Sequence, residues 1–358
     1  MNIITTIGPS SDSAEVIKKL SHSGANFFRI NLSHSEVESL DKYFQLIKSV
    51  GLKPSLDTQG AQIRLLEIDG VKSLSCGDNV IFYNKDIPSD FTSTELKIPV
   101  NHAEVFSQIK IGNKLRIDFD GAVVQIVEIN SDFNFAKAVV LSAGNIRSNR
   151  AIDIIDNPVR LNSLTDFDIY AIGQYANELD SIFLSFTNRS DDIILVKNLL
   201  KDNLSGKNQP KLIAKIESKM GIANIEEILP LVDGILIDRG DLSREISISY
   251  IPVATHSLIN ICHKFKKPCY IATNILDSMM TASLPSRAEV SDLYNLYSMG
   301  VGGIVLASEV AIGKNPVDSV RVVKHIYNIY KSAVNSTLAF LPTGKAMNVL
   351  PDHLAQWL

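Results

Sequence analysis

Short apolar runs alternate along the chain with longer stretches in which apolar residues recur at helical spacing. Near the start, runs over 2–7, 27–32 and 53–57 are separated by helical stretches over 13–23 and 37–50. The same alternation returns later, where the apolar runs cover 181–186, 211–217, 234–238, 269–274 and 303–307. The helical stretches of that part cover 164–179, 191–204, 219–231, 251–266, 287–299 and 317–333.

The apolar runs are continuous and do not alternate strictly with polar residues, which is typical of strands covered on both faces. Eight such runs, each with its own helical stretch, predict an α/β fold: a (β/α)8 TIM barrel of parallel strands. An open, doubly wound parallel sheet is the alternative that the same rhythm allows.

A segment of another kind interrupts the third strand–helix unit. It contains short strand-like runs separated by turn residues, and these runs cover 80–82, 96–98, 114–117, 122–129 and 135–141. This pattern predicts a small all-β domain inserted after strand three, at the barrel face where active sites lie, so that a mobile lid is expected. The predicted domains are a barrel over 1–65 and 158–337, an insertion over 66–157 and a tail over 338–358.

Composition narrows the class of protein. Of 358 residues, 45% are hydrophobic and 21% charged, which excludes a disordered chain. The net charge of −4 argues against a nucleic-acid partner. Three cysteines without disulfide spacing indicate a reduced compartment. No apolar run approaches the ~18 residues of a membrane span. The start of the chain lacks signal-peptide features, so a cytoplasmic location without a membrane partner is expected.

A barrel of this kind carries its reactive groups at the carboxyl ends of its strands. Lys215 and Glu217 end the fifth predicted strand, two residues apart and therefore on one face. Asp241 follows the next strand, so Glu217 and Asp241 are expected to lie close together. Two carboxylates suit Mg²⁺ or Mn²⁺, and Gly240 would let backbone N–H groups approach an anion. A structural Lys215–Glu217 ion pair and a simple turn around Gly240 remain the alternatives.

Further polar side chains end the second predicted strand. Arg29, Asn31 and Ser33 alternate onto one face. The forked guanidinium of Arg29 suits phosphate, and the oxygens of Asn31 and Ser33 could coordinate a cation. Asp57 ends the third strand, and Arg64 follows it.

Taken together, the strand ends predict a charged mouth. Its basic groups (Arg29, Arg64, Lys215) indicate an anionic, phosphorylated substrate, and its carboxylates (Asp57, Glu217, Asp241) indicate a metal. We find no Ser-His-Asp ordering, HExxH or Walker loop. The residues alone therefore lead to metal-assisted phosphoryl or enolate chemistry.

At these positions the chain resembles the pyruvate kinase family. The resemblance runs from about residue 3 to 335. It rests on ordered motifs: Thr6-Ile7-Gly8-Pro9-Ser10, Arg29-Ile30-Asn31-Leu32-Ser33-His34, Leu56-Asp57-Thr58-Gln59-Gly60 with Ile63-Arg64, Lys215-Ile216-Glu217, Arg239-Gly240-Asp241-Leu242, Ala272-Thr273 and Pro285-Ser286-Arg287-Ala288-Glu289 with Ser291-Asp292. The inserted β domain matches the lid of that family.

The resemblance implies a phosphotransferase that moves phosphate from phosphoenolpyruvate to ADP, giving pyruvate and ATP. Glu217 and Asp241 would hold Mg²⁺ or Mn²⁺. The residues implied in catalysis are Lys215, Arg29, Arg64 and Thr273, and those implied in substrate binding are Gly240, Arg239, Thr273 and Lys215. The nucleotide would be bordered by Pro9, Arg29, His34, Arg64 and Arg150. A K⁺ site would be formed by Asn31, Ser33, Asp57 and Thr58.

The sequence also departs from the family pattern. The separate C-terminal domain is expected to be absent, which leaves a homodimer through the barrel as the oligomer that the resemblance allows. Around the site, the family usually has other residues at Gln59, Gln62, Arg150, Asp238, Ser243 and Ala307. Gln62 stands where the family usually has a Glu, and that Glu bears on K⁺ dependence. Asp238 replaces a small residue, and its carboxylate would repel an anionic substrate or change metal loading.

Two other functions remain open on these residues. Glu217, Glu226-Glu227-Ile228 and Gly240-Asp241-Leu242-Ser243 also resemble metal-dependent 2-keto-acid aldolases, which stabilise an enolate on a divalent metal. Lys215 and the inserted domain favour phosphoryl transfer instead. A non-catalytic phosphoenolpyruvate-binding protein is the third hypothesis, and Asp238 with the other altered residues is its main support.

Overall fold

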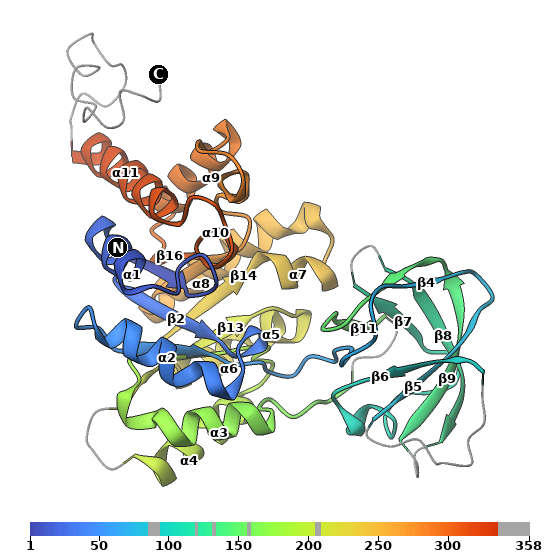
Figure 1. The fold of residues 1–358 in the computed structure, drawn as a ribbon. Helices are drawn as coiled ribbons and strands as arrows, with labels where there is room; N and C mark the ends of the chain where they lie inside the picture. Colours follow the sequence, from blue (N-terminus) through green and yellow to red (C-terminus); the bar gives the residue numbers. More distant parts are fainter. Residues whose placement is uncertain (85–93, 119–120, 131–133, 156–158, 205–208, 336–358) are drawn as a thin grey trace. The chain divides into compact units, whose positions relative to one another are not determined.

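The chain divides into two compact units. The computed structural model describes residues 1–84, 94–118, 121–130, 134–155, 159–204 and 209–335 (Figure 1). The first unit, here called the barrel unit, comprises Met1–Gln59 and Asp166–Leu358, and the inserted unit comprises Gly60–Thr165. The predicted boundary at 157–158 and the predicted tail over 338–358 lie outside the described residues.

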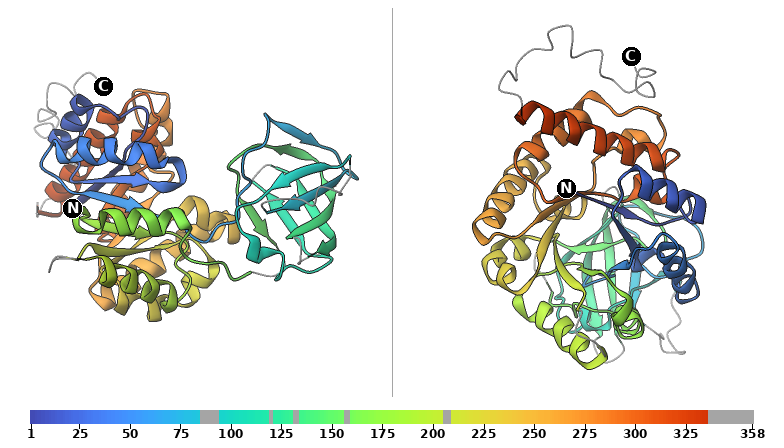
Figure 2. Two further views of the ribbon diagram at one scale, coloured as in Figure 1. Left: turned by 60° about the horizontal axis from the view of Figure 1, so that its bottom comes forward. Right: turned by 90° about the vertical axis from the view of Figure 1, so that its left-hand side faces the viewer.

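The barrel unit is a closed ring of eight parallel strands, which confirms the predicted fold class and excludes the open sheet. The strands are β1 (Asn2–Thr6), β2 (Phe27–Asn31), β3 (Pro54–Asp57), β12 (Ser181–Leu184), β13 (Lys211–Ile216), β14 (Gly234–Asp238), β15 (Cys269–Ala272) and β16 (Gly303–Leu306). The strands follow one another around the ring in the order of the sequence. Pairing of β1 with β16, from Asn2↔Gly303 to Thr5↔Leu306, closes the ring. Figure 2 shows the helices arranged around these strands.

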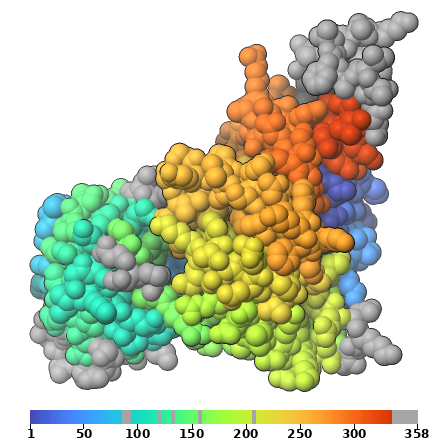
Figure 3. All heavy atoms as spheres, turned by 180° about the vertical axis from the view of Figure 1, so that it is seen from behind, coloured from blue at the N-terminus to red at the C-terminus, as the bar shows by residue number. Residues whose placement is uncertain are grey.

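The outer layer is built from helices that follow the strands. They are α1 (Ala14–Ser23), α2 (Val37–Lys48), α3 (Asp166–Tyr175), α4 (Ser190–Asn203), α5 (Lys219–Ala223), α6 (Ile225–Ile228), α7 (Arg239–Glu245), α8 (Ile251–Phe265), α9 (Arg287–Ser298), α10 (Ser308–Ala311) and α11 (Pro316–Asn335). Seen from behind, the yellow and orange part of this layer forms a continuous surface (Figure 3). None of the helices in the described ranges is both long and apolar enough to cross a membrane.

Local chemistry explains where several helices begin and end. The Ser13 side chain accepts a hydrogen bond from the backbone N–H of Val16 at the start of α1, and Gly24 ends that helix at φ 121°. Ser286 and Glu289 form a reciprocal capping box at the start of α9. These contacts satisfy backbone groups at the helix ends and so fix where α1 and α9 begin and where α1 ends.

Two helical predictions differ from the structure. The single helix expected over 219–231 is broken into α5, α6 and a 3₁₀ turn (Leu229–Leu231), with Asn224 between the first two and a proline inside the turn. The alternative of a simple turn around Gly240 is wrong, because a helix, α7, that the sequence pattern did not predict begins directly after β14. The pattern missed α7 because the helix is only seven residues long.

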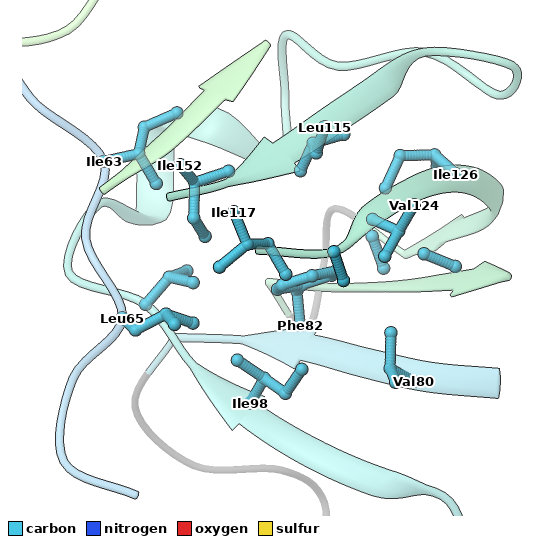
Figure 4. Packing of buried hydrophobic residues seen from close by; sticks show 14 of the residues in the cluster. Ile63, Leu65, Val80, Phe82, Ile98, Leu115, Ile117, Val124, Ile126 and Ile152 are labelled. Carbon is cyan, nitrogen blue, oxygen red and sulfur yellow. The ribbon is translucent and has the colours of Figure 1, made fainter. Parts of the chain in front are cut away.

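The inserted unit is all-β. Its six-stranded sheet has the order β11-β7-β8-β9-β5-β6, and β4 pairs with β10 separately. The strands are β4 (Lys72–Leu74), β5 (Asn79–Tyr83), β6 (Leu96–Pro99), β7 (Lys114–Ile117), β8 (Val123–Asn130), β9 (Phe135–Ser142), β10 (Gly144–Ile146) and β11 (Ile152–Ile154). Side chains such as Val80, Phe82, Ile117 and Val124 point toward one another in its core (Figure 4).

The residues just after β3 belong to the inserted unit. The backbone N–H of Arg64 donates a hydrogen bond to the side-chain oxygen of Asn101 at 2.8 Å, and Arg64 forms an antiparallel β-bridge with Ala151. Leu65 pairs similarly with Val100. The domain boundary after residue 65 stays a prediction, but these contacts favour a boundary closer to Gln59.

Replacement of Phe28 tests the packing between strands and helices. Phe28 is fully buried in β2 and points to the opposite face from Arg29. We expect Phe28→Ala to lower the free energy of unfolding by about 3–5 kcal/mol, because it leaves a cavity in a close-packed layer. Denaturant unfolding followed by circular dichroism measures this loss. Val253→Ala, at a side chain 59% exposed, should change it by less than about 0.5 kcal/mol. Equal unfolding midpoints for the two variants would contradict the packing described here.

Candidate active site

The barrel brings polar side chains together at the carboxyl ends of its strands. Lys215 lies two residues after Ile213, which packs in an apolar cluster with Phe183, Leu236 and Val305 from other strands. Because residues two apart share a face, Lys215 continues the face of Ile213 toward the end of β13. The cluster therefore closes the barrel beneath Lys215, and the charged groups occupy its mouth.

Lys215 is surrounded by carboxylates. Its Nζ lies 2.8 Å from Glu217 Oε1, 3.1 Å from Asp57 Oδ1 and 3.9 Å from Asp238 Oδ2. It also donates a hydrogen bond to Ser185 Oγ at 3.0 Å. The prediction that Lys215 and Glu217 lie on one face is confirmed, and the ion pair that the sequence left as the structural alternative is formed as well, with the ammonium group buried at the centre of an ion-pair network.

Asp57 joins this network to a second cation. Arg29 Nη1 lies 3.0 Å from Asp57 Oδ2, and both side chains are buried. Arg29 also donates from Nε and Nη2 to Thr6 Oγ1, at 3.1 and 2.9 Å, and its guanidinium lies 5.5 Å from the centre of the Phe183 ring. These contacts hold Arg29 in one orientation, with one carboxylate shared between two cations.

The pKa values of Glu217 and Lys215 are both raised, but for different reasons. Burial is the largest cause that raises the pKa of Glu217, to about 8; Asp241 and Asp238 add to it, and Lys215 opposes it. For Lys215, burial acts to lower the pKa, but the carboxylates of Asp57, Glu217 and Asp238 raise it above its ordinary value. The mouth thus holds a lysine that stays charged and a carboxyl group that lacks sufficient positive charge around it.

The carboxylates fit a divalent cation. One oxygen each of Glu217, Asp238 and Asp241 lies within 4.8 Å of the others. Glu217 Oε2 accepts a hydrogen bond from Phe186 N–H at 2.6 Å, but Oε1 is buried without a hydrogen-bond partner among the described residues, despite its short ion-pair distance to Lys215. Hard cations such as Mg²⁺ and Mn²⁺ prefer oxygen ligands of this kind. The donor set therefore fits such an ion.

The raised pKa of Glu217 predicts proton release when a divalent cation binds. A carboxyl group must be deprotonated to act as a ligand, so affinity should fall as the pH falls below about 8, approaching tenfold per pH unit. Titration of Mn²⁺ into the protein by calorimetry, at pH 6.5 and 8.5 in buffers of different ionisation enthalpy, measures both quantities. An affinity independent of pH, with no proton released, would contradict this assignment.

Thr273 occupies a turn held by several contacts. It follows β15 with φ 63°, and Asn274 has φ 52°, a backbone conformation that costs energy for a β-branched residue such as Thr273. Thr273 Oγ1 accepts a hydrogen bond from Gly240 N–H at 2.7 Å and donates one to Asp238 Oδ1 at 3.0 Å. The threonine hydroxyl is therefore placed between the start of α7 and the carboxylate that ends β14.

Arg239 supports this turn. It donates to the backbone oxygens of Thr273 and Asn274, at 2.8–3.2 Å, and pairs with Asp292 on α9 at 2.8 Å. These contacts favour a positioning role for Arg239. The substrate-binding role implied by the resemblance stays a prediction.

Three residues of this site were missed in the sequence. Ser185 contacts Lys215, and its hydroxyl lies 3.3 Å from Asp57 Oδ1. Phe186 uses its backbone N–H to hold Glu217, with φ 49°. Thr6 orients Arg29. The two residues after β12 are visible in the sequence as the end of the fourth strand. Thr6 lies in the first motif of the resemblance, but nothing in the sequence indicates that it contacts Arg29.

The residues implied in K⁺ binding lie close in the fold but are already engaged. Asn31 and Asp57 are register partners on β2 and β3. Asn31 Oδ1 accepts from Ser33 N–H at 2.9 Å, and Thr58 Oγ1 accepts from Ser185 N–H at 2.9 Å. Asp57 is paired with two cations. A monovalent cation would have to compete with these partners, so this arrangement does not fit K⁺ well, and we derive no step through it.

The remaining predicted residues are distributed over both units. In the barrel unit, Pro9 is exposed after β1, and His34 is exposed at the end of a 3₁₀ turn (Leu32–His34). In the inserted unit, Arg64 donates to the backbone oxygen of Asn149, and Arg150 pairs with Asp118 at 3.2 Å. Their roles at a nucleotide stay predictions.

The residues that depart from the family pattern have defined local contacts. The backbone N–H of Gln59 donates a hydrogen bond to Asp168 Oδ1 at 2.7 Å, and its side-chain amide donates to the Leu32 carbonyl. The Ser243 hydroxyl donates to the Gly240 carbonyl at 2.7 Å. Asp238, by contrast, lies directly among the metal-ligand candidates.

Comparison with known proteins agrees with this geometry. The family model described as the pyruvate kinase barrel domain matches residues 1–320. A pyruvate kinase from Staphylococcus epidermidis is 33% identical over 335 residues, which cover 90% of this chain and 56% of that protein. One from Chlamydia muridarum is 32% identical over 334 residues, 90% of this chain and 67% of that protein.

A solved structure gives the same result. A crystal structure of a pyruvate kinase from Cryptosporidium parvum superposes with a TM-score of 0.80 at 28% identity, covering 94% of this chain and 70% of that chain. The chain spans little more than half the length of the Staphylococcus relative. From its barrel, from its strand-end residues and from these matches, we conclude that the chain belongs to the pyruvate kinase family.

Proposed function

We propose that the chain transfers the phosphoryl group of phosphoenolpyruvate to ADP in a reaction that depends on a divalent metal and yields pyruvate and ATP. One observation supports this most: the buried Lys215 ammonium lies beside the carboxylate cluster of Glu217, Asp238 and Asp241, in a barrel of the pyruvate kinase family. A cation beside a metal site is what a migrating, negatively charged phosphoryl group requires. The cytoplasmic location expected from the sequence belongs to the same proposal.

The charged residues would act mainly by positioning. Lys215 Nζ and the Arg29 guanidinium would donate hydrogen bonds to phosphoryl oxygens while the bond to the enol oxygen breaks and the bond to ADP forms. Glu217 and Asp241 would hold Mg²⁺ or Mn²⁺, which when bound neutralises charge on the phosphoryl and enolate oxygens. Because Lys215 and Arg29 are fixed by ion pairs, little reorganisation is needed when that charge develops.

Thr273 and Gly240 would act on the pyruvyl part of the substrate. Gly240 lies at the start of α7, where its lack of a side chain would let the substrate carboxylate approach the backbone, while its own N–H donates to Thr273 Oγ1. Thr273 Oγ1, which donates to Asp238 Oδ1, would lie on the path along which a proton from water reaches the carbon of the enolate after phosphoryl transfer, completing pyruvate. In the inserted unit, Arg64 and Arg150 would contribute to nucleotide binding.

A coupled assay tests the function. Phosphoenolpyruvate, ADP and Mg²⁺, with and without K⁺, are mixed with the protein, and pyruvate and ATP are measured together. Equal amounts of both products are expected. If neither forms, also with Mn²⁺, the proposal is wrong. Pyruvate–aldehyde condensation would then support the aldolase-like function, and phosphoenolpyruvate binding without turnover would support the non-catalytic one.

A further inference from the structure

Asp238 presents its two carboxylate oxygens to different partners. It is the last residue of β14 and is 6% exposed. Oδ1 accepts a hydrogen bond from Thr273 Oγ1 at 3.0 Å, which fixes the rotation of the carboxylate. Oδ2 faces the ion-pair network, 3.9 Å from Lys215 Nζ. A metal ligand is commonly oriented in this way, by a hydrogen bond to its other oxygen.

The oxygens around Asp238 favour a cation at this point. The ligand atoms of Glu217, Asp238 and Asp241 lie within 4.8 Å of one another, a spacing that a hard cation with ligands at about 2.1–2.5 Å can bridge. The buried Glu217 Oε1 has the Lys215 ammonium 2.8 Å away as an ion-pair partner but no hydrogen bond of good geometry among the described residues, so its coordination can still be completed by a cation. Lys215 and Arg29 contribute two positive charges to a group of four carboxylates, and both cations pair with Asp57, so the other three carboxylates share the remaining charge of Lys215.

We propose that Asp238 is a third protein ligand of the divalent cation, bound through Oδ2, in addition to Glu217 and Asp241. Three carboxylates make a site that holds the cation firmly before any anionic substrate arrives, because affinity for a hard cation rises with the number of charged ligands. The inference rests on the metal site of the proposed function but not on phosphoryl transfer itself.

Binding of Mn²⁺ to the full chain, without substrate, tests this ligand. Free Mn²⁺ is measured by electron paramagnetic resonance in titrations of the wild type, Asp238→Asn and Asp202→Asn. Asp202 is an exposed carboxylate on α4 and controls for the loss of one charge. We expect Asp238→Asn to raise the dissociation constant at least tenfold and Asp202→Asn to change it less than twofold.

A second measurement counts the water ligands of the bound ion directly. Electron–nuclear double resonance of bound Mn²⁺ in ¹⁷O-water counts its water ligands. With three monodentate carboxylates on a six-coordinate ion, about three waters are expected in the wild type and one more in Asp238→Asn. Unchanged affinity and water count in Asp238→Asn would overturn the inference and leave Asp238 as a hydrogen-bond acceptor for Thr273 only. A protein that binds Mn²⁺ through Asp238 but forms no ATP would overturn the proposed function and not this inference.

Discussion

Lys215→Met is expected to slow phosphoryl transfer by about 10³-fold or more, while Mn²⁺ still binds. Lys215 is a buried cation at the centre of the mouth, within 4 Å of three carboxylates, and methionine at this position would remove its charge from the migrating phosphoryl group and leave Arg29 as the remaining donor of the pair. Loss of one preorganised charge contact costs rates on this scale. Single-turnover formation of ATP from bound phosphoenolpyruvate measures the step directly.

Two further variants define what that result means. Lys215→Arg keeps the charge but changes its geometry, and it should recover only part of the rate. Lys211→Met removes an exposed lysine from the start of the same strand and should leave the rate unchanged. A Lys215→Met enzyme within about tenfold of the wild type would show that Lys215 is a structural partner of the carboxylates and has no direct part in transfer.

Glu217→Gln is expected to abolish both Mn²⁺ binding and turnover. The amide has nearly the same shape and can still accept the hydrogen bond from Phe186 N–H through its oxygen, so the fold should be retained. It offers no charge to a cation, and the dissociation constant of Mn²⁺ should rise by about 100-fold or more. Calorimetry of Mn²⁺ and the steady-state rate report the two effects on one preparation.

Glu226→Gln is the matched control, because it makes the same chemical change at an exposed position on α6. It should bind Mn²⁺ and turn over as the wild type does. If Glu217→Gln binds Mn²⁺ normally and remains active, the carboxylate cluster is a structural network and the divalent site lies elsewhere.

Most of the barrel follows from hydrophobic patterning. Each predicted strand is a continuous apolar run because it is covered on both faces. Such a run has few places in a folded chain other than a strand buried in the interior. Helix ends were harder to predict where length or composition gave little signal. α7 is too short to show a helical period, and the break at Asn224 depends on how α5 and α6 pack against their neighbours.

The sequence predicts those parts of the site that depend only on which residues end each strand. Lys215 and Glu217 were expected on one face because side chains alternate along a strand, and Asp241 because adjacent parallel strands end together. The role of Asp57 as a common partner of Arg29 and Lys215 depends on closure of the ring, since β2 and β13 are not neighbours. Likewise, the positive φ of Thr273 results from contacts with Arg239 and Gly240, which no local pattern encodes.

Phosphorus-31 nuclear magnetic resonance provides the most direct test of phosphoryl transfer at this mouth. The full chain is mixed with phosphoenolpyruvate, ADP and Mg²⁺, and the phosphorus signals are followed over time. We expect the phosphoenolpyruvate signal to disappear and the γ-phosphate signal of ATP to appear in equal amounts with the wild type, and neither change with Lys215→Met. Loss of phosphoenolpyruvate to inorganic phosphate without ATP, or no change with the wild type, would contradict the assignment.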